Sequence, residues 1–192
     1  KTGDNNRKKD DQLPELLREL ASCGHHGARL LERTGLPVWA RGPLFQLMGF
    51  VAKADGRVTE LDIRYCESLM RNFGCSPRQR RRLIRRFSAG KRAQEPAVPL
   101  WLRLFTRRWP GTAYRLSIAL AHLCFQDGPP SPARKARCQN AMLDLDLPAS
   151  DGTRILQSYQ SKVWITSPDE GTNEPLTGLA RACQVVGGKP SD

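Results

Sequence analysis

The chain has 192 residues, of which 39% are hydrophobic and 7% aromatic, enough for one well-buried domain with flanking segments. It contains no apolar run of about 18 residues and no signal-type stretch, so the sequence predicts neither a membrane span nor export. Lys and Arg number 31 against 19 Asp and Glu, which leaves a formal net charge of +12. This surplus favours anionic partners such as nucleic acid, anionic lipid or an acidic protein, although an Arg-rich composition also follows from high-GC coding.

The first part of the chain predicts a tail, an arm and a buried helix. Residues 1–12 are polar and charged without apolar periodicity, which is typical of a disordered tail. Residues 13–42 predict an accessory helical arm, because the leucines at 13, 16, 17 and 20 follow helical spacing. The next helix is predicted from about Pro43 to Lys53 and is apolar on most sides, as a central buried helix would be.

Helix caps divide the following stretch into two further helices. After the turn at Asp55-Gly56, Thr59 and Asp62 form an N-terminal capping pattern. The apolar stripe of the helix that follows is Leu61, Tyr65, Leu69 and Phe73. Ser76-Pro77 opens another helix, and residues 88–99 have the Gly and Pro content of a connector.

The second half of the chain repeats this pattern. After a short apolar helix at residues 100–105, residues 113–160 match residues 43–87 under a shift of 127 − 55 = 72 positions. The shift pairs apolar or capping residues: Met48 with Leu120, Thr59 with Ser131, Cys66 with Cys138, and Met70 with Met142. One helical hairpin cannot bury its apolar stripe alone, whereas two related hairpins can close a common core. We therefore expect an all-α fold, a helical bundle of two pseudo-symmetric repeats in one domain over residues 43–160.

The chemically reactive side chains do not form a catalytic pattern. The six cysteines include no C-x-x-C pair, and three lie on apolar helix faces, namely Cys66, Cys124 and Cys138. This pattern predicts reduced core thiols in a cytoplasmic protein. Cys23, His25 and His26 lack a second group at zinc-type spacing and are interpreted as a polar turn. His122 is predicted to be a packed or surface histidine. With no nucleophile motif, phosphate loop or dinucleotide fingerprint, we expect no catalytic residues and no enzyme.

The segment LMGFVAKADGRVTELDI (47–63) resembles the central TerB-like domain of DjlA-type membrane-anchored DnaJ proteins. Three further segments follow in the order of that family: SAGK (88–91), CFQDG (124–128) and LARACQVVGGKPSD (179–192), the last resembling the opening helix of a J domain. The resemblance implies an all-helical module between a membrane anchor and a J domain, on the cytoplasmic side of the bacterial inner membrane. The His-Pro-Asp tripeptide of J domains is absent, so residues 161–192 are expected to be a linker and a truncated J-domain start, which cannot by itself stimulate a DnaK-type chaperone.

Acidic residues gather around the two inter-helix turns, and the candidate metal ligands are Asp55, Glu60, Asp62 and Asp127. Clustered oxygen ligands suit calcium or magnesium. The resemblance implies divalent metal binding at such positions, but Arg134 stands where relatives often carry Glu. Turn and cap chemistry also accounts for Asp and Gly at these places. We therefore predict that no cofactor is required and keep calcium or magnesium binding as the alternative.

Residues 78–92 carry eight basic and no acidic side chains. The candidate surface for an anionic partner consists of Arg78, Arg81, Arg82, Arg85 and Arg86. Clustered arginines neutralise nucleic-acid phosphates, rest on anionic lipid or dock on an acidic protein. No stacking platform or DNA-binding motif accompanies them, so nucleic acid is the least favoured of these partners.

Together, these features favour a non-enzymatic interaction domain of a membrane-anchored DnaJ-type co-chaperone. Its expected partners are a DnaK-type chaperone, reached through the J domain, and a client or acidic protein bound by the helical bundle. A homodimer and an anionic membrane surface remain open as further partners. The alternative functions are a metal-binding module of the tellurite-resistance or stress-response type and a basic nucleic-acid-binding protein.

Overall fold

The computed structural model describes residues 12–160, and within this range the chain forms nine α-helices, one short 3₁₀ helix and no strand. The all-α expectation is confirmed. In chain order the elements are α2 (Gln12–Ser22), α3 (Gly27–Thr34), α4 (Val38–Ala52), η1 (Lys53–Asp55), α5 (Glu60–Asn72), α6 (Pro77–Arg92), α7 (Leu100–Arg108), α8 (Pro110–Phe125), α9 (Pro132–Asp144) and α10 (Ala149–Gln160). Residues 1–11 of the predicted tail and the whole predicted linker with its J-domain start lie outside the described residues. None of the described helices is long and apolar enough to cross a membrane.

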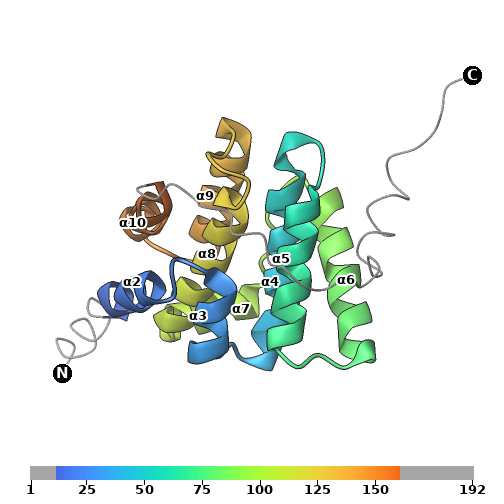
Figure 1. Cartoon of the computed structure of the whole chain (residues 1–192), viewed down its shortest axis with the longest axis horizontal. Coiled ribbons are helices and arrows are strands. Elements are labelled where there is room, and N and C mark those ends of the chain that lie inside the picture. Colours follow the sequence, from blue (N-terminus) through green and yellow to red (C-terminus); the bar gives the residue numbers. More distant parts are fainter. Residues whose placement is uncertain (1–11, 161–192) are drawn as a thin grey trace, which may run out of the picture.

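Two largely apolar helices, α4 and α8, form the centre of the bundle, and the other helices pack around them (Figure 1). Every residue of α8 from Thr112 to Phe125 is buried except Arg115, as expected for a helix without a polar face. In α4 the burial extends from Ala40 to Ala52 along most of the helix. This helix begins at Val38 rather than at about Pro43. Pro43 therefore lies inside α4, as its sixth residue, where it lacks the N–H that would donate to the carbonyl oxygen of Trp39.

Helices α4 and α6 pack backbone against backbone. A Cβ atom on Gly49 would overlap the carbonyl oxygen of Phe87, and one on Gly90 would overlap the carbonyl oxygen of Gln46. Only glycine allows this approach, since it has no Cβ. The contact also explains why α6 continues to Arg92 through residues that the sequence analysis assigned to a connector.

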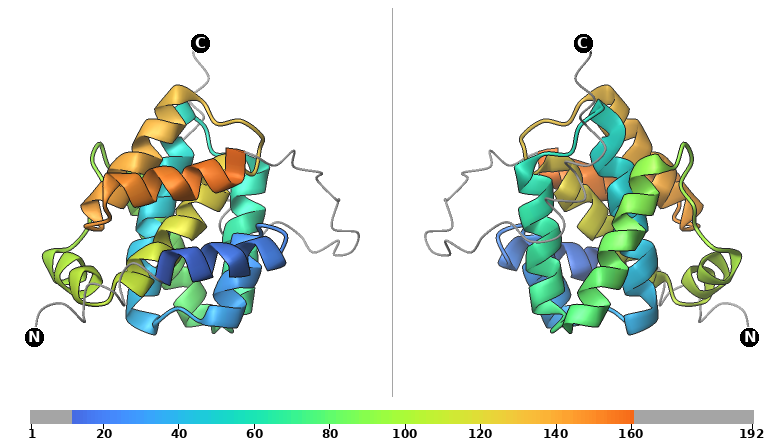
Figure 2. Two further views of the ribbon diagram at one scale, coloured as in Figure 1. Left: turned by 90° about the vertical axis from the view of Figure 1, so that its left-hand side faces the viewer. Right: turned by 90° about the vertical axis from the view of Figure 1, so that its right-hand side faces the viewer.

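The predicted arm contributes to the same core as the rest of the bundle. Leucines of α2 and α3 are buried in one hydrophobic cluster with α4 and α8: Leu13, Leu16, Leu20, Leu30 and Leu31. Both views of Figure 2 show α2 and α3 lying against the bundle. These two helices therefore help to cover the central pair.

All five described cysteines are buried free thiols. A hydrogen bond with Cys124, together with burial, raises the pKa of Cys138 well above its ordinary value. A protonated, buried thiol packs as a small apolar side chain, in agreement with the prediction for Cys66, Cys124 and Cys138.

Candidate functional site

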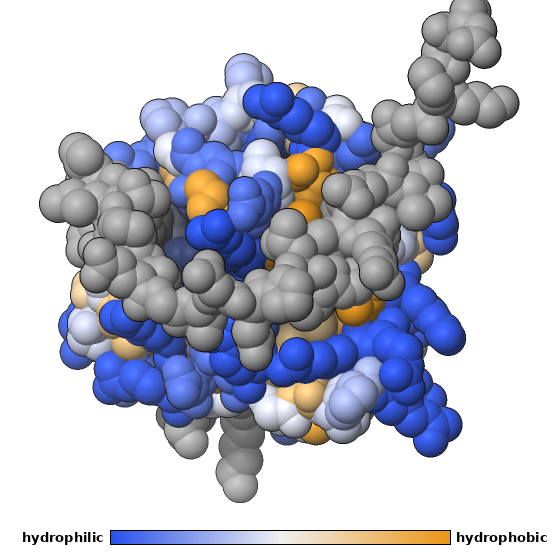
Figure 3. Space-filling model, turned by 45° about the vertical axis from the view of Figure 1, so that its right-hand side comes forward, coloured by the Kyte–Doolittle hydropathy of each residue, from blue (hydrophilic) through white to orange (hydrophobic). Residues whose placement is uncertain are grey.

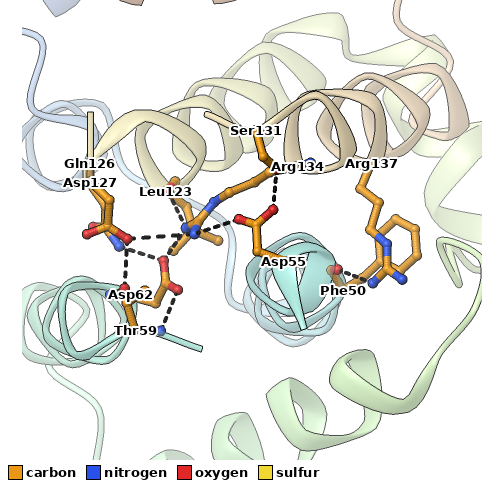
Figure 4. Close-up of polar contacts among 10 residues, drawn as sticks. All are labelled: Phe50, Asp55, Thr59, Asp62, Leu123, Gln126, Asp127, Ser131, Arg134 and Arg137. Carbon is orange, nitrogen blue, oxygen red and sulfur yellow. Dashed lines mark hydrogen bonds and ion pairs between the residues drawn. The ribbon is translucent and has the colours of Figure 1, made fainter. Parts of the chain in front are cut away.

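Arg134 lies among the acidic residues of the two inter-helix loops (Figure 4). It is the third residue of α9 and only 3% exposed. Its Nη2 donates to the carboxylate of Asp62 and, at 2.7 Å, to the carbonyl oxygen of Leu123. Its Nη1 lies 3.7 Å from the carboxylate of Asp127 and 3.9 Å from that of Asp55. Three of the four predicted acidic site residues are thus gathered around one guanidinium.

Asp62 is the fully buried acid of this group. Besides Arg134, it accepts hydrogen bonds from the backbone N–H of Thr59 at 3.0 Å and from Gln126 Nε2 at 2.7 Å. Burial raises the pKa of Asp62, while the charge of Arg134 and these hydrogen bonds oppose the shift. Because the carboxylate has three donors, including a cation, its buried charge is partly compensated.

Two further hydrogen bonds connect the loops, and each runs from a hydroxyl of one loop to the aspartate of the other. Thr59 Oγ1 donates to Asp127 Oδ2 at 2.8 Å, and Ser131 Oγ donates to Asp55 Oδ1. Each hydroxyl also accepts from the backbone N–H of the third residue of its own helix, at 3.2 Å in α5 and 3.1 Å in α9. Each residue therefore caps its own helix and binds the aspartate of the other loop. We call Asp55, Thr59, Asp62, Gln126, Asp127, Ser131 and Arg134 the inter-loop cluster.

Glu60, the fourth candidate ligand, does not join this cluster. Its carboxylate pairs with Arg64 at 2.7 Å, one helical turn away, and both side chains are more than half exposed. Within residues 12–160, no group of three or more His, Cys, Asp or Glu side chains has an arrangement that could hold a metal ion. The positive charge between the loop aspartates comes from Arg134.

The sequence analysis missed the burial of both members of the central ion pair. It placed Leu61 on the buried stripe of α5, but Leu61 is 37% exposed and the adjacent Asp62 is buried. The signal that could have found the pair is the shift of 72 positions, because 62 + 72 = 134. Residues of opposite charge at matching positions of two capped helices are candidates for direct contact.

Arg137 connects α9 to α4 (Figure 4). Its Nη1 donates to the carbonyl oxygen of Phe50 at 2.9 Å, and its guanidinium lies 4.8 Å from the centre of the Phe50 ring. Under the same shift, the equivalent of Phe50 is His122 and that of Arg137 is Tyr65. The rings of His122 and Tyr65 are also neighbours, with 4.4 Å between their centres.

His122 is packed inside the bundle. The backbone N–H of Gly27 donates to its Nδ1 at 3.2 Å, and the ring of His26 lies 4.7 Å away. Burial, and secondarily His26, lower the pKa of His122 to about 3, so the ring is neutral at physiological pH. The sequence predicted a polar turn around Cys23, His25 and His26, and the chain does turn there; Cys23 and His25 are buried, with the carbonyl oxygen of His25 3.2 Å from Nδ1 of His122 on α8, whereas His26 is half-buried.

The five predicted arginines for an anionic partner are all exposed on α6. Positions 78, 81, 82, 85 and 86 follow the spacing of one helical face, whereas Leu83, Phe87 and Gly90 bury the other face. We call these five residues the arginine stripe. The side of the molecule that carries α5 and α6 is largely hydrophilic in Figure 3.

Comparison with known proteins gives a partial match. No protein-family model matches the chain, and no solved structure matches it. Over 47 residues the chain is 47% identical to the co-chaperone protein DjlA of Coxiella burnetii (strain RSA 493 / Nine Mile phase I). The matched stretch covers 24% of this chain and 17% of the length of that protein. The similarity supports a relation to DnaJ-type co-chaperones.

Proposed function

We propose that this chain is a non-enzymatic interaction domain of a membrane-anchored DnaJ-type co-chaperone. The observation that carries the proposal is the segment shared with DjlA. A J domain of the parent protein would engage a DnaK-type chaperone at the cytoplasmic side of the inner membrane. The helical bundle would position that J domain and recruit a client or partner protein.

We also propose that the bundle consists of two TerB-like repeats, residues 43–87 and 113–160, related by an approximate two-fold axis near the inter-loop cluster. The exchanged contacts support this relation. Under the shift of 72 positions, the bond from Thr59 to Asp127 becomes the bond from Ser131 to Asp55. In a two-fold arrangement each contact occurs twice in this way, with the roles of the two halves exchanged.

We propose that the arginine stripe binds an acidic protein surface. Its guanidinium groups are exposed along one face of α6, and guanidinium matches carboxylates with two parallel hydrogen bonds. Phe87, the one aromatic residue of α6, is buried, so the helix offers nucleic-acid bases no stacking surface. The stripe therefore suits carboxylates better than single-stranded nucleic acid.

Crosslinking in bacterial cells tests this function. A photo-reactive amino acid replaces Arg81 on the stripe or, as a matched control, Gln157 on the exposed face of α10. We expect crosslinks from residue 81 to DnaK-type chaperones or their clients, and few from residue 157. The additional change Arg82→Glu with Arg85→Glu should abolish the residue-81 crosslinks while helicity stays intact; Arg86 is left unchanged because it donates to Gln46. Equal crosslinking from both positions, or products sensitive to nuclease, would contradict the proposal.

We propose further that the inter-loop cluster works as an ion-pair network without a divalent cation. The buried guanidinium of Arg134 already faces all three aspartates, and a second cation beside it would be repelled. Calorimetric titration with calcium or magnesium should therefore give no saturable heat. A saturable heat that Asp55→Asn removes would favour the metal-binding alternative.

A further inference from the structure

A patch of exposed apolar side chains lies on α7 and the start of α4. It consists of Trp39, Trp101, Phe105 and Trp109 together with Val38, Leu100 and Leu104, and we call it the aromatic patch. Its rings touch in a chain, with centres 5.8 Å apart for Trp39 and Trp101, 5.3 Å for Trp39 and Phe105, and 5.0 Å for Phe105 and Trp109. Contiguous exposed apolar surface of this kind marks an interaction site.

The patch is exposed because α7 uses only a narrow side to pack. Leu102 and Thr106, one turn apart, are its buried residues, whereas Leu100 is 72% and Leu104 59% exposed. In both views of Figure 2, α7 lies at the outer edge of the bundle. The exposed apolar side chains of α7 therefore lie on a helix at the edge of the bundle.

The two segments that form the patch carry basic side chains and no acidic ones. Residues 33–54 and 96–126 contain no Asp or Glu. Arg107 and Arg108 are exposed on α7, and Arg103 pairs with Asp144 of α9 at 2.5 Å. Exposed tryptophan and leucine next to arginine is the composition of helices that lie in the interface of an anionic bilayer.

We propose that the aromatic patch docks the domain on an anionic phospholipid bilayer. The tryptophan and phenylalanine rings would enter the headgroup region, and the arginines of α7 would contact lipid phosphates. A second copy of the chain fits less well, because face-to-face patches would bring Arg107 and Arg108 of both copies together. This surface is separate from the arginine stripe, which remains available to a protein partner.

Vesicle binding of the purified chain tests the proposal. The probes are vesicles of phosphatidylcholine alone and of equimolar phosphatidylcholine and phosphatidylglycerol. We expect binding to the anionic vesicles and at least about tenfold weaker binding by the variant Trp101→Ala with Phe105→Ala, since two inserted rings are lost. The matched control, Arg82→Glu with Arg85→Glu, should retain most of the binding. Circular dichroism checks that both variants stay helical.

Fluorescence shows whether the rings enter the lipid. Three of the four tryptophans belong to the patch, and Trp164→Phe removes the fourth. In that background, anionic vesicles should shift the emission to shorter wavelength, and lipids brominated on the acyl chains should quench it. Lack of vesicle binding, equal binding by the Trp101→Ala/Phe105→Ala variant, or loss only in the α6 variant would overturn the proposal. A dimer in sedimentation that this patch variant disrupts would also overturn it, in favour of a second copy.

Discussion

The first turns of α5 and α9 share a backbone arrangement but carry opposite charges. Both follow a glycine with positive φ, 80° at Gly56 and 102° at Gly128, and both begin with a hydroxyl residue that caps the third backbone N–H. In α5 that third residue is Asp62, which bonds back to its own cap. In α9 it is Arg134, which cannot accept a hydrogen bond and instead reaches across to α5.

Under the proposed two-fold relation, this difference lets α5 and α9 meet closely at buried positions. Near a two-fold axis, equivalent residues face one another. Two copies of Asp62 would bring two buried carboxylates together, and two copies of Arg134 two buried cations, and either arrangement is unfavourable. One residue of each sign gives an ion pair at the same place.

The largest effect is expected from removing the cation. Arg134→Ala leaves Asp62 buried without its main compensating charge, so the free energy of unfolding should fall by about 3 to 5 kcal/mol. The matched control is Arg154→Ala, which removes an exposed arginine from α10 and should change the free energy of unfolding by less than about 0.5 kcal/mol. Urea unfolding followed by circular dichroism measures both.

Exchanging the charges of Asp62 and Arg134 tests whether the first turns of α5 and α9 are equivalent. In the double variant Asp62→Arg with Arg134→Asp, the aspartate would cap α9 and the arginine would reach from α5. We expect this variant to be more stable than either single variant by at least about 2 kcal/mol. A loss equal to the sum of the two single losses would show that the turns are not interchangeable.

The next effect concerns the buried His122 of α8, at the position that the shift of 72 pairs with Phe50 of α4. The unfolded chain protonates His122 below about pH 6.5 and the folded chain only near pH 3, so stability is lost as the pH falls between these values. By pH 4 this loss should reach about 3 kcal/mol. His122→Asn keeps an acceptor for Gly27 and should flatten the dependence, as measured by urea unfolding from pH 7 to 4. An unchanged slope would assign the acid sensitivity to other groups.

The smallest effect separates capping from contact between the loops. Ser76 caps α6 in the same way as Thr59 caps α5, but it takes no part in the inter-loop cluster. Ser76→Ala should therefore cost about 1 kcal/mol, whereas Thr59→Ala and Ser131→Ala should each cost about 0.5 to 1 kcal/mol more. Thermal unfolding of the three variants gives the comparison. Equal losses would mean that the bonds between the loops contribute nothing to stability.

Features that depend on residues close to one another in the sequence were predictable from it. The capping patterns at Thr59, Ser76 and Ser131 predicted helix starts correctly, because a cap bonds within its own first turn. The two central helices were predictable because they lack a polar face. The burial of Asp62 was not predictable, because it depends on an arginine 72 positions away. The continuation of α6 was not predictable either, because it depends on the close approach of Gly49 and Gly90.

The pair of Asp62 and Arg134 also bears on how the polypeptide could be divided. Under the proposed two-fold relation, a piece ending after α6 and a piece beginning at α7 carry complementary charges at their shared interface. Each piece would then associate with the other piece and not with a second copy of itself. A piece that carries only Asp62 or only Arg134 would therefore need the other piece to compensate its buried charge.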